Sequence, residues 1–188
     1  MIGKSVKTIL LTGVLILLSG SVAIGQVKEK VKIIEGMKAP TFYLQDLSGG
    51  EIFLSDLVGE PIASYKKRGT EQVVILSLFA TWCVPCKAEI PELERIYLEN
   101  SDKNLTVFLI DVEEKKEIVT LFLDSMGVNL PTLMDKYGKI SEKYGVVSIP
   151  SLYIIDKDGI VRFVSHGFKS VEEFRTDITK ILRTLFLL

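Results

Sequence analysis

The two cysteines of the chain, Cys83 and Cys86, lie in the segment FATWCVPCKAEIPELE and are separated by two residues. A Cys-x-x-Cys pair can form a structural disulfide, provide half of a zinc site, bind copper(I), or act as a redox centre. These four possibilities differ in what else the chain must provide. The rest of the sequence therefore helps to separate them.

Zinc binding and a purely structural disulfide fit the sequence poorly. A zinc site needs four ligands, and the chain has one histidine and no second cysteine pair to complete the set. A disulfide that closes so short a loop removes little conformational entropy from the unfolded chain, so it adds little stability. Two thiolates suffice for copper(I), so a metal carrier remains an alternative to a redox centre.

A redox pair needs elements that position it, and the sequence predicts a strand and a helix around the cysteines. Residues 73–80 (VVILSLFA) are continuously apolar, which is typical of a strand buried on both faces. A helix is predicted within residues 83–100, because apolar residues recur at helical spacing from Ile90 onward. Cys83 then lies at the helix N-terminus, where the dipole and free N–H groups favour a thiolate, and Cys86 follows one turn later.

The order of the predicted elements indicates an α/β fold with a central mixed sheet and helices on both faces. The right-handed crossover rule places strand 73–80 in the middle of this sheet. Its carboxyl end, where open α/β sheets hold their sites, carries Trp82 and Cys83. The other predicted elements are strands at 42–44, 52–54, 104–112, 130–135, 151–156 and 160–165, and helices at 114–127, 138–145 and 170–186.

Composition limits the possible classes of partner. The chain has 188 residues, 47% of them hydrophobic, and a formal net charge of −1. This is the composition of an ordinary globular domain, without the broad basic field that nucleic-acid binding requires. A single histidine excludes multi-histidine metal sites. No nucleic acid, metal or cofactor is therefore expected.

The N-terminal residues have the pattern of an export signal. Lys4 and Lys7 precede an uncharged stretch, whose most apolar part at residues 9–18 is shorter than the roughly 20 residues of a membrane-spanning helix. We expect residues 1–25 to be a signal peptide or a retained membrane anchor, residues 26–35 a polar tether, and residues 36–188 the folded domain. An exported domain meets an oxidising compartment, and the membrane contact is expected through the N-terminal segment alone.

Four segments resemble those of thioredoxin-fold proteins. FATWCVPCKAEIPEL resembles their active-site segment, and GVVSIPSLYIIDKDGIV their cis-proline segment and terminal hairpin. GMKAPTFYLQDLSGGEIFLSDLVG and LPTLMDKYGKISEKYGV resemble the N-terminal extension and the stretch before the cis-proline in the exported TlpA/ResA/DsbE group of AhpC/TSA-like redoxins. The resemblance covers most of residues 36–186. It implies a thioredoxin fold, a central mixed β-sheet flanked by helices, with an N-terminal β-hairpin extension.

The resemblance implies roles for the residues of the active-site segment. Cys83 corresponds to the attacking thiol and Cys86 to the resolving thiol, and together they form the redox disulfide. Trp82 corresponds to a residue that covers this disulfide, with an ordinary core aromatic as the alternative. Pro85 belongs to the dipeptide that helps to set the reduction potential. Pro91 falls inside the helical pattern and predicts a kink there.

The resemblance also implies a partner-binding role for the segment around Pro150. Pro150 corresponds to the cis-proline that packs against the disulfide, and a trans-proline at the start of a strand is the alternative. The backbone of Ile149 would then pair with an extended stretch of the partner, in the manner of β-strand addition.

The chain departs from the thioredoxin pattern before the cysteines and in one loop. Ser77 stands where thioredoxins carry a buried aspartate. Glu89, three residues after Cys86 on the same helical face, is expected to take over as the carboxylate base, with a solvated helix residue as the alternative. Residues Ile62 to Gln72 form an insertion to which we assign no role. His166 is expected to be a surface or loop residue.

These features predict an exported thiol–disulfide oxidoreductase of the periplasm or the outer face of the cytoplasmic membrane. The task implied by the resemblance is the reduction of envelope protein disulfides, including that of apocytochrome c before haem attachment. Protein thiols and a membrane electron donor are the expected partners. A peroxiredoxin-like thiol peroxidase and a copper(I) carrier are the alternatives. The peroxidase is disfavoured because peroxiredoxins carry a Thr-x-x-Cys pattern around their peroxidatic cysteine. In this chain, Trp82, Val84 and Pro85 occupy that neighbourhood.

Overall fold

The computed structural model describes residues 32–59 and 72–187. The predicted signal peptide or anchor, most of the tether and all of the insertion except Gln72 lie outside these residues. The described elements are β1 (Tyr43–Gln45), β2 (Glu51–Phe53), the 3₁₀ turn η1 (Leu54–Asp56), β3 (Val73–Phe79), α1 (Val84–Glu99), β4 (Leu105–Val112), α2 (Lys116–Met126), β5 (Thr132–Asp135), α3 (Lys139–Lys143), β6 (Ser151–Ile155), β7 (Val161–His166) and α4 (Val171–Phe186).

Five of the strands form one mixed sheet in the order β5-β4-β3-β6-β7. Strand β3 lies in the middle, parallel to β4 and antiparallel to β6. Strands β1 and β2 pair separately as an antiparallel hairpin. The arrangement confirms the predicted central mixed sheet, the mid-sheet position of β3 and the N-terminal hairpin extension.

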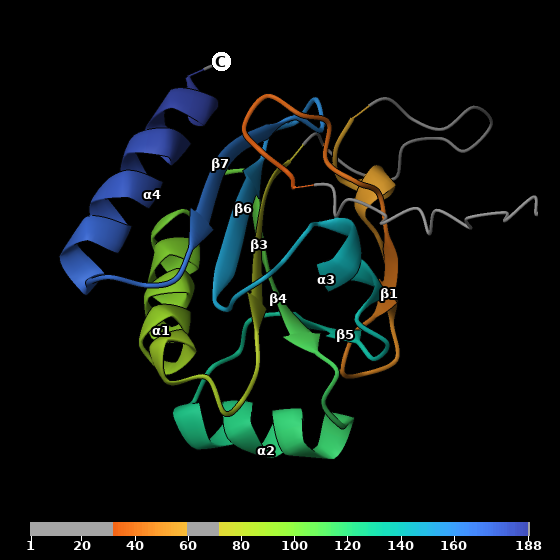
Figure 1. The fold of residues 1–188 in the computed structure, drawn as a ribbon. Coiled ribbons are helices and arrows are strands. Elements are labelled where there is room, and N and C mark those ends of the chain that lie inside the picture. Colours follow the sequence, from red (N-terminus) through yellow and green to blue (C-terminus); the bar gives the residue numbers. More distant parts are fainter. Residues whose placement is uncertain (1–31, 60–71, 188) are drawn as a thin grey trace, which may run out of the picture.

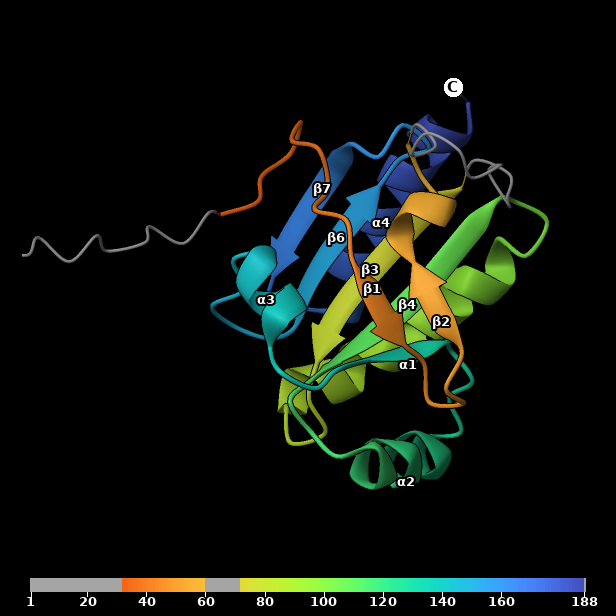
Figure 2. The same ribbon diagram turned by 90° about the vertical axis from the view of Figure 1, so that its right-hand side faces the viewer.

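Alternate residues of β3 face two apolar cores, because successive side chains of a strand point to opposite faces. Val73, Ile75 and Phe79 pack with residues of α1, α2 and α4, whereas the even-numbered residues pack with the hairpin and α3. Figures 1 and 2 show α1 and α4 on one face of the sheet and the hairpin with α3 on the other. Ser77 shares the parity of Ile75 and Phe79, so it faces α1.

One residue of the predicted tether packs into the core. Ile33 is 2% exposed, whereas its neighbour Ile34 is exposed. At the predicted start of the domain, the Gly36 N–H donates to the Val161 carbonyl at 2.8 Å. A single apolar pair within the polar segment VKEKVKIIEG has no periodicity, so nothing in the local pattern indicated this packing.

Helix α1 begins at the cysteines for local reasons. The Sγ atom of Cys83, the N-cap residue, accepts the Cys86 N–H at 3.2 Å, and Pro85 lies in the first turn, where its missing N–H costs nothing. Apolar residues at helical spacing, among them Ile90 and Leu93, then bury one face of the helix against β3. Pro91 lies inside the helix, as predicted.

Candidate active site

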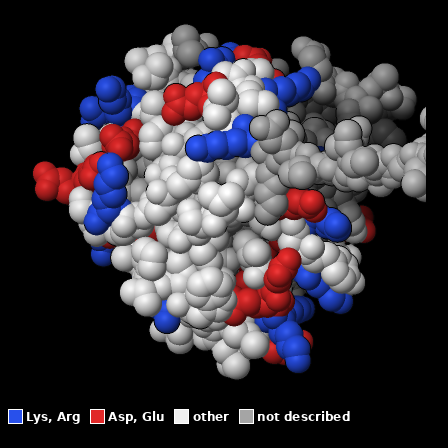
Figure 3. All heavy atoms as spheres, in the orientation of Figure 1, with Lys and Arg blue, Asp and Glu red and all other residues white. Residues whose placement is uncertain are grey.

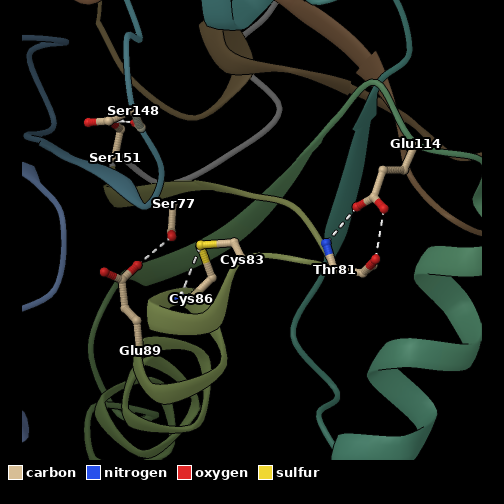
Figure 4. Close-up of a disulfide and its surroundings, with 8 residues drawn as sticks. All are labelled: Ser77, Thr81, Cys83, Cys86, Glu89, Glu114, Ser148 and Ser151. Carbon is tan, nitrogen blue, oxygen red and sulfur yellow. Dashed lines mark hydrogen bonds between the residues drawn. A yellow bond between two sulfur atoms is a disulfide. The ribbon is translucent and has the colours of Figure 1, made fainter.

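The two cysteines form a disulfide at the carboxyl end of β3, where the chain enters α1 (Figure 4). The Sγ atoms are 2.06 Å apart. Cys83 keeps 3% of its surface exposed and Cys86 none. A partner molecule would therefore meet Cys83 first, while Cys86 lies behind it in the core.

The segment around Pro150 lies beside the same end of β3. The Ile149–Pro150 peptide bond is cis, as the resemblance implied, and Pro150 is buried. Ser151, the next residue, pairs with Leu78 of β3, so the sheet register brings the proline segment alongside the strand that leads to Cys83. The cis bond that the resemblance implied is therefore present, while the packing of Pro150 against the disulfide stays a prediction.

Exposed apolar side chains adjoin the cysteines and the cis-proline in the sequence, and we call them the apolar rim. Trp82 is 69% exposed, Val84 74% and Val147, close to the cis-proline, 78%, and Pro85 is also exposed. The alternative that Trp82 is a core aromatic is wrong. Its expected contact over the disulfide stays a prediction.

Glu89 is buried on the inner face of α1. Its carboxyl accepts the Ser77 hydroxyl at 2.6 Å, and 2% of the residue is exposed. Burial raises the pKa of Glu89 to about 7, and the hydrogen bond from Ser77 partly opposes this rise. The alternative of a solvated helix residue is wrong. Glu89 can thus hold or release a proton near neutral pH.

Figure 4 shows that Ser77 and Glu89 lie on the same side of the disulfide and point toward one another. Ser77 is itself 1% exposed. The residue that replaces the usual buried aspartate is therefore the hydrogen-bond donor to the carboxyl expected to act in its place. The sequence indicated both residues, but not their contact.

The sequence analysis gave no role to three further side chains around the ends of β3 and β6, and two of them, Glu114 and Asp111, it did not name. Glu114 accepts both the backbone N–H and the hydroxyl of Thr81, at 2.5 and 2.7 Å. Asp111, at the end of β4, is 0% exposed, and the N–H of Glu114 donates to it at 3.0 Å. A carboxylate at the carboxyl end of a buried strand was a signal that could have identified Asp111.

The third residue is His166, which is exposed as expected and lies next to the proline segment. Its Nδ1 is 2.9 Å from the Ser151 hydroxyl oxygen, and this hydroxyl donates to the Ser148 carbonyl at 2.7 Å. Since the hydroxyl hydrogen is engaged by Ser148, the nitrogen of His166 acts as the donor to Ser151.

Comparison with known proteins identifies the family. The sequence profile of the AhpC/TSA family matches residues 36–164. The chain belongs to the AhpC/TSA family. Among similar proteins, the thiol-disulfide oxidoreductase ResA of Bacillus anthracis is 32% identical, over 89% of this chain and 92% of its own length. The thioredoxin-like protein YneN of Bacillus subtilis is 34% identical, over 78% and 79% respectively.

Solved structures agree with this AhpC/TSA assignment. A Chlorobium tepidum protein assigned as the thiol:disulfide interchange protein DsbE has a TM-score of 0.68 and 26% identity, covering 80% of this chain and 99% of that one. A Bacteroides thetaiotaomicron protein assigned as a disulfide isomerase has a TM-score of 0.69 and 27% identity, over 81% and 91%. The protein is a thioredoxin-like thiol–disulfide oxidoreductase of the TlpA/ResA/DsbE group.

No helix within residues 32–59 and 72–187 is both long and apolar enough to cross a membrane. On the side drawn in Figure 3, lysine and arginine side chains alternate with acidic ones around a broad uncharged area. This side therefore carries no broad field of one sign.

Proposed function

We propose that the protein is an exported reductant of protein disulfides, in which Cys83 attacks and Cys86 resolves. The observation that carries this proposal is the placement of the pair. Cys83 caps α1 with the slightly exposed sulfur, while Cys86 lies fully buried one turn behind it. The helix N-terminus favours the thiolate form of Cys83, and the thiolate is the attacking species.

The exchange takes two balanced steps. The Cys83 thiolate attacks one sulfur of the partner disulfide, which forms a mixed disulfide and releases the other partner sulfur as a thiolate. Cys86 then loses its proton and attacks the Cys83 sulfur. This second attack releases the partner dithiol and leaves the Cys83–Cys86 disulfide. A membrane electron donor that reduces this disulfide would complete the cycle.

Glu89 supplies the base in the second step. Its pKa of about 7 allows the carboxylate to accept the Cys86 proton at neutral pH and to return it later. Residues three apart on a helix share a face, so Glu89 and Cys86 are suitably placed for this transfer.

Partner binding is assigned to the apolar rim and the proline segment. The backbone of Ile149 would pair with an extended stretch of the partner beside the buried Pro150. Trp82, Val84 and Pro85 would cover the apolar side chains of that stretch. Backbone hydrogen bonds depend little on the side chains of the partner. The side chains of the apolar rim therefore determine which partners bind.

The N-terminal sequence supports action in the envelope, and the names of the relatives support thiol–disulfide exchange as the activity. A basic start followed by a short apolar stretch is typical of export, and the relatives that match most of the chain are named thiol-disulfide oxidoreductases. Within this role, reduction of apocytochrome c before haem attachment is the specific task we assign.

Stopped-flow exchange with a disulfide-bonded Cys-x-x-Cys-His peptide tests the proposal. The reduced protein should reduce this peptide faster than a scrambled peptide with distant cysteines. Consumption of hydrogen peroxide at a comparable rate would favour the peroxidase alternative, and tight copper(I) binding without peptide reduction would favour the metal carrier. The reduction potential of the pair would be near −270 mV for a reductant and near −120 mV for an oxidant.

The hydrogen bond from the Ser77 hydroxyl should lower the pKa of Glu89. In Ser77→Ala, we expect the pKa of Glu89 to rise above its value of about 7, because the substitution removes the one hydrogen bond that lowers it. Carbon-13 NMR of the labelled glutamate carboxyl across pH 5–9 measures the shift. Ser151→Ala, which removes a serine hydroxyl from the neighbouring strand, is the control. An unchanged or lowered Glu89 pKa in Ser77→Ala would contradict the assignment.

A further inference from the structure

A chain of polar side chains links the end of β4 to the residue that precedes Trp82. Glu114 follows β4 and accepts two hydrogen bonds from Thr81, one from the backbone and one from the hydroxyl. These contacts join segments 33 residues apart in sequence. Figure 4 shows Glu114 pointing toward Thr81 at the end of the strand that leads to Cys83. Glu114 thus holds the backbone just ahead of the redox pair.

Asp111 lies behind Glu114. Its Oδ2 accepts the Glu114 N–H at 3.0 Å, whereas its Oδ1 is buried and has no donor. Within the part of the chain that the structure describes, Asp111 Oδ1 is the one buried side-chain oxygen or nitrogen that has no hydrogen-bond partner. A buried carboxylate oxygen without a donor is costly, but a proton on that oxygen turns it into a donor.

The groups around Asp111 favour such a proton. Burial is the largest cause that raises the pKa of Asp111, and the side chains of Glu114 and Asp135 add to it. Together, and against the lowering effect of the hydrogen bond from the Glu114 N–H, they bring this pKa to about 7. Asp135, on β5, has its own donors in the N–H groups of Ile140 and Ser141 and offers none to Asp111. On the other side, the β3 residue in register with Asp111 is the apolar Phe79. The protonated Asp111 can donate to Glu114.

We propose that Asp111 and Glu114 form an acid–carboxylate pair that positions the Thr81–Trp82 segment beside the disulfide. Glu114 and Asp111 are positioning residues, because neither touches the sulfur atoms in any contact of the described residues. When Asp111 loses its proton, the carboxylates of Asp111 and Glu114 repel one another. The Glu114 side chain then shifts, and its two hydrogen bonds with Thr81 weaken. The inference rests on the proposed exchange at Cys83, since it concerns the loop that presents this residue to a partner.

Trp82 provides a direct readout of this loop. It is the single tryptophan of the chain and follows Thr81 directly. We expect its fluorescence anisotropy to fall as pH rises through about 7, because the weakened loop moves more freely. The measurement uses the oxidised protein, in which the cysteines do not titrate. Among the described residues, the two groups whose pKa is raised to about 7 are Asp111 and Glu89. In Asp111→Asn the transition should disappear, since the amide donates to Glu114 at every pH. In Glu89→Gln it should persist.

Variants at Thr81 separate positioning from folding. Thr81→Val keeps the shape but loses the hydroxyl, and should lower kcat/KM for peptide reduction by about 5- to 10-fold, as expected for one lost hydrogen bond. Thr81→Ser keeps both donors and should match the wild type. Glu117→Gln removes an exposed acid from the nearby helix α2 and is the charge control. The melting temperature, measured for each variant, checks that the fold is intact.

The outcomes distinguish this inference from the proposed function. A wild-type protein without exchange activity would overturn the proposed function. The anisotropy measurements would still test whether Asp111 and Glu114 position the Thr81–Trp82 segment. Normal kcat/KM and normal anisotropy in Thr81→Val, or a pH transition that survives in Asp111→Asn, would overturn the positioning role alone.

Discussion

In the Cys86→Ser variant, we expect partner proteins to accumulate as mixed disulfides with Cys83. The fully buried Cys86 is the group that would expel a bound partner, and serine cannot perform this attack. Cys83 stays at the helix N-terminus, where its thiolate remains favoured. Affinity capture from an envelope extract, followed by non-reducing and reducing gels, measures the trapped species. Their yield should exceed that of the wild type at least about tenfold.

The Cys83→Ser variant is the matched control. It removes the sulfur that meets the partner and leaves Cys86 behind the helix start, so it should trap no more protein than the wild type. Both variants should lose peptide turnover entirely. Equal trapping by the two variants would contradict the assignment of attacking and resolving thiols, and stronger trapping by Cys83→Ser would reverse it.

Much of the fold was predictable because it depends on short-range patterns. The short apolar run at 73–80 is typical of a strand buried on both faces, and the helical spacing after Cys86 indicated which face of α1 enters the core. The turn Lys157–Asp158–Gly159 indicated the β6–β7 hairpin. Each of these elements is specified by residues close together in the chain.

The contacts that hold the active-site loop depend instead on how elements pack. Ser77 and Glu89 were each singled out, but their hydrogen bond requires the particular packing of α1 on β3. Glu114 and Thr81 meet because parallel strands β3 and β4 end side by side. His166 reaches Ser151 through the β6–β7 register. Such long-range contacts have no signature in a single sequence.

The chemistry of Glu89 predicts a change in the pH dependence of exchange in Glu89→Gln. In the wild type, the rate of the second step should rise with pH up to about 7 and then level off, as the carboxyl loses its proton and becomes a base. In Glu89→Gln this inflection should vanish, and the rate should follow the ionisation of the thiol itself. At pH 7 we expect the variant to be about tenfold slower. Loss of the general base costs about 10², and a Cys86 pKa lowered by about two units restores about tenfold through a larger thiolate fraction.

The same substitution should lower the pKa of Cys86. Groups three residues apart on a helix lie about 5–6 Å from one another. At that distance, and at an effective dielectric constant of about 20, two like charges repel by about 3 kcal/mol, which corresponds to about two pKa units. Above pH 7 the ionised Glu89 therefore keeps Cys86 protonated, whereas glutamine does not. Alkylation rates of the reduced proteins against pH measure this difference, with Glu117→Gln as the charge control.

Stability gives an independent readout of the buried carboxyl. The pKa of Glu89 is about 7 in the folded protein and 4.5 as its ordinary value, so the folded state binds the proton more tightly. The stabilisation from this protonated group is complete below pH 4.5 and is lost as pH rises to 7, because the unfolded chain ionises first. Between these two pH values, the free energy of unfolding of the oxidised wild type should fall by about 3 kcal/mol relative to Glu89→Gln. Denaturant titrations at pH 4.5, 6 and 7.5 measure the difference. Parallel stability curves, together with a Cys86 that titrates identically in both proteins, would show that Glu89 holds no proton that the exchange can use.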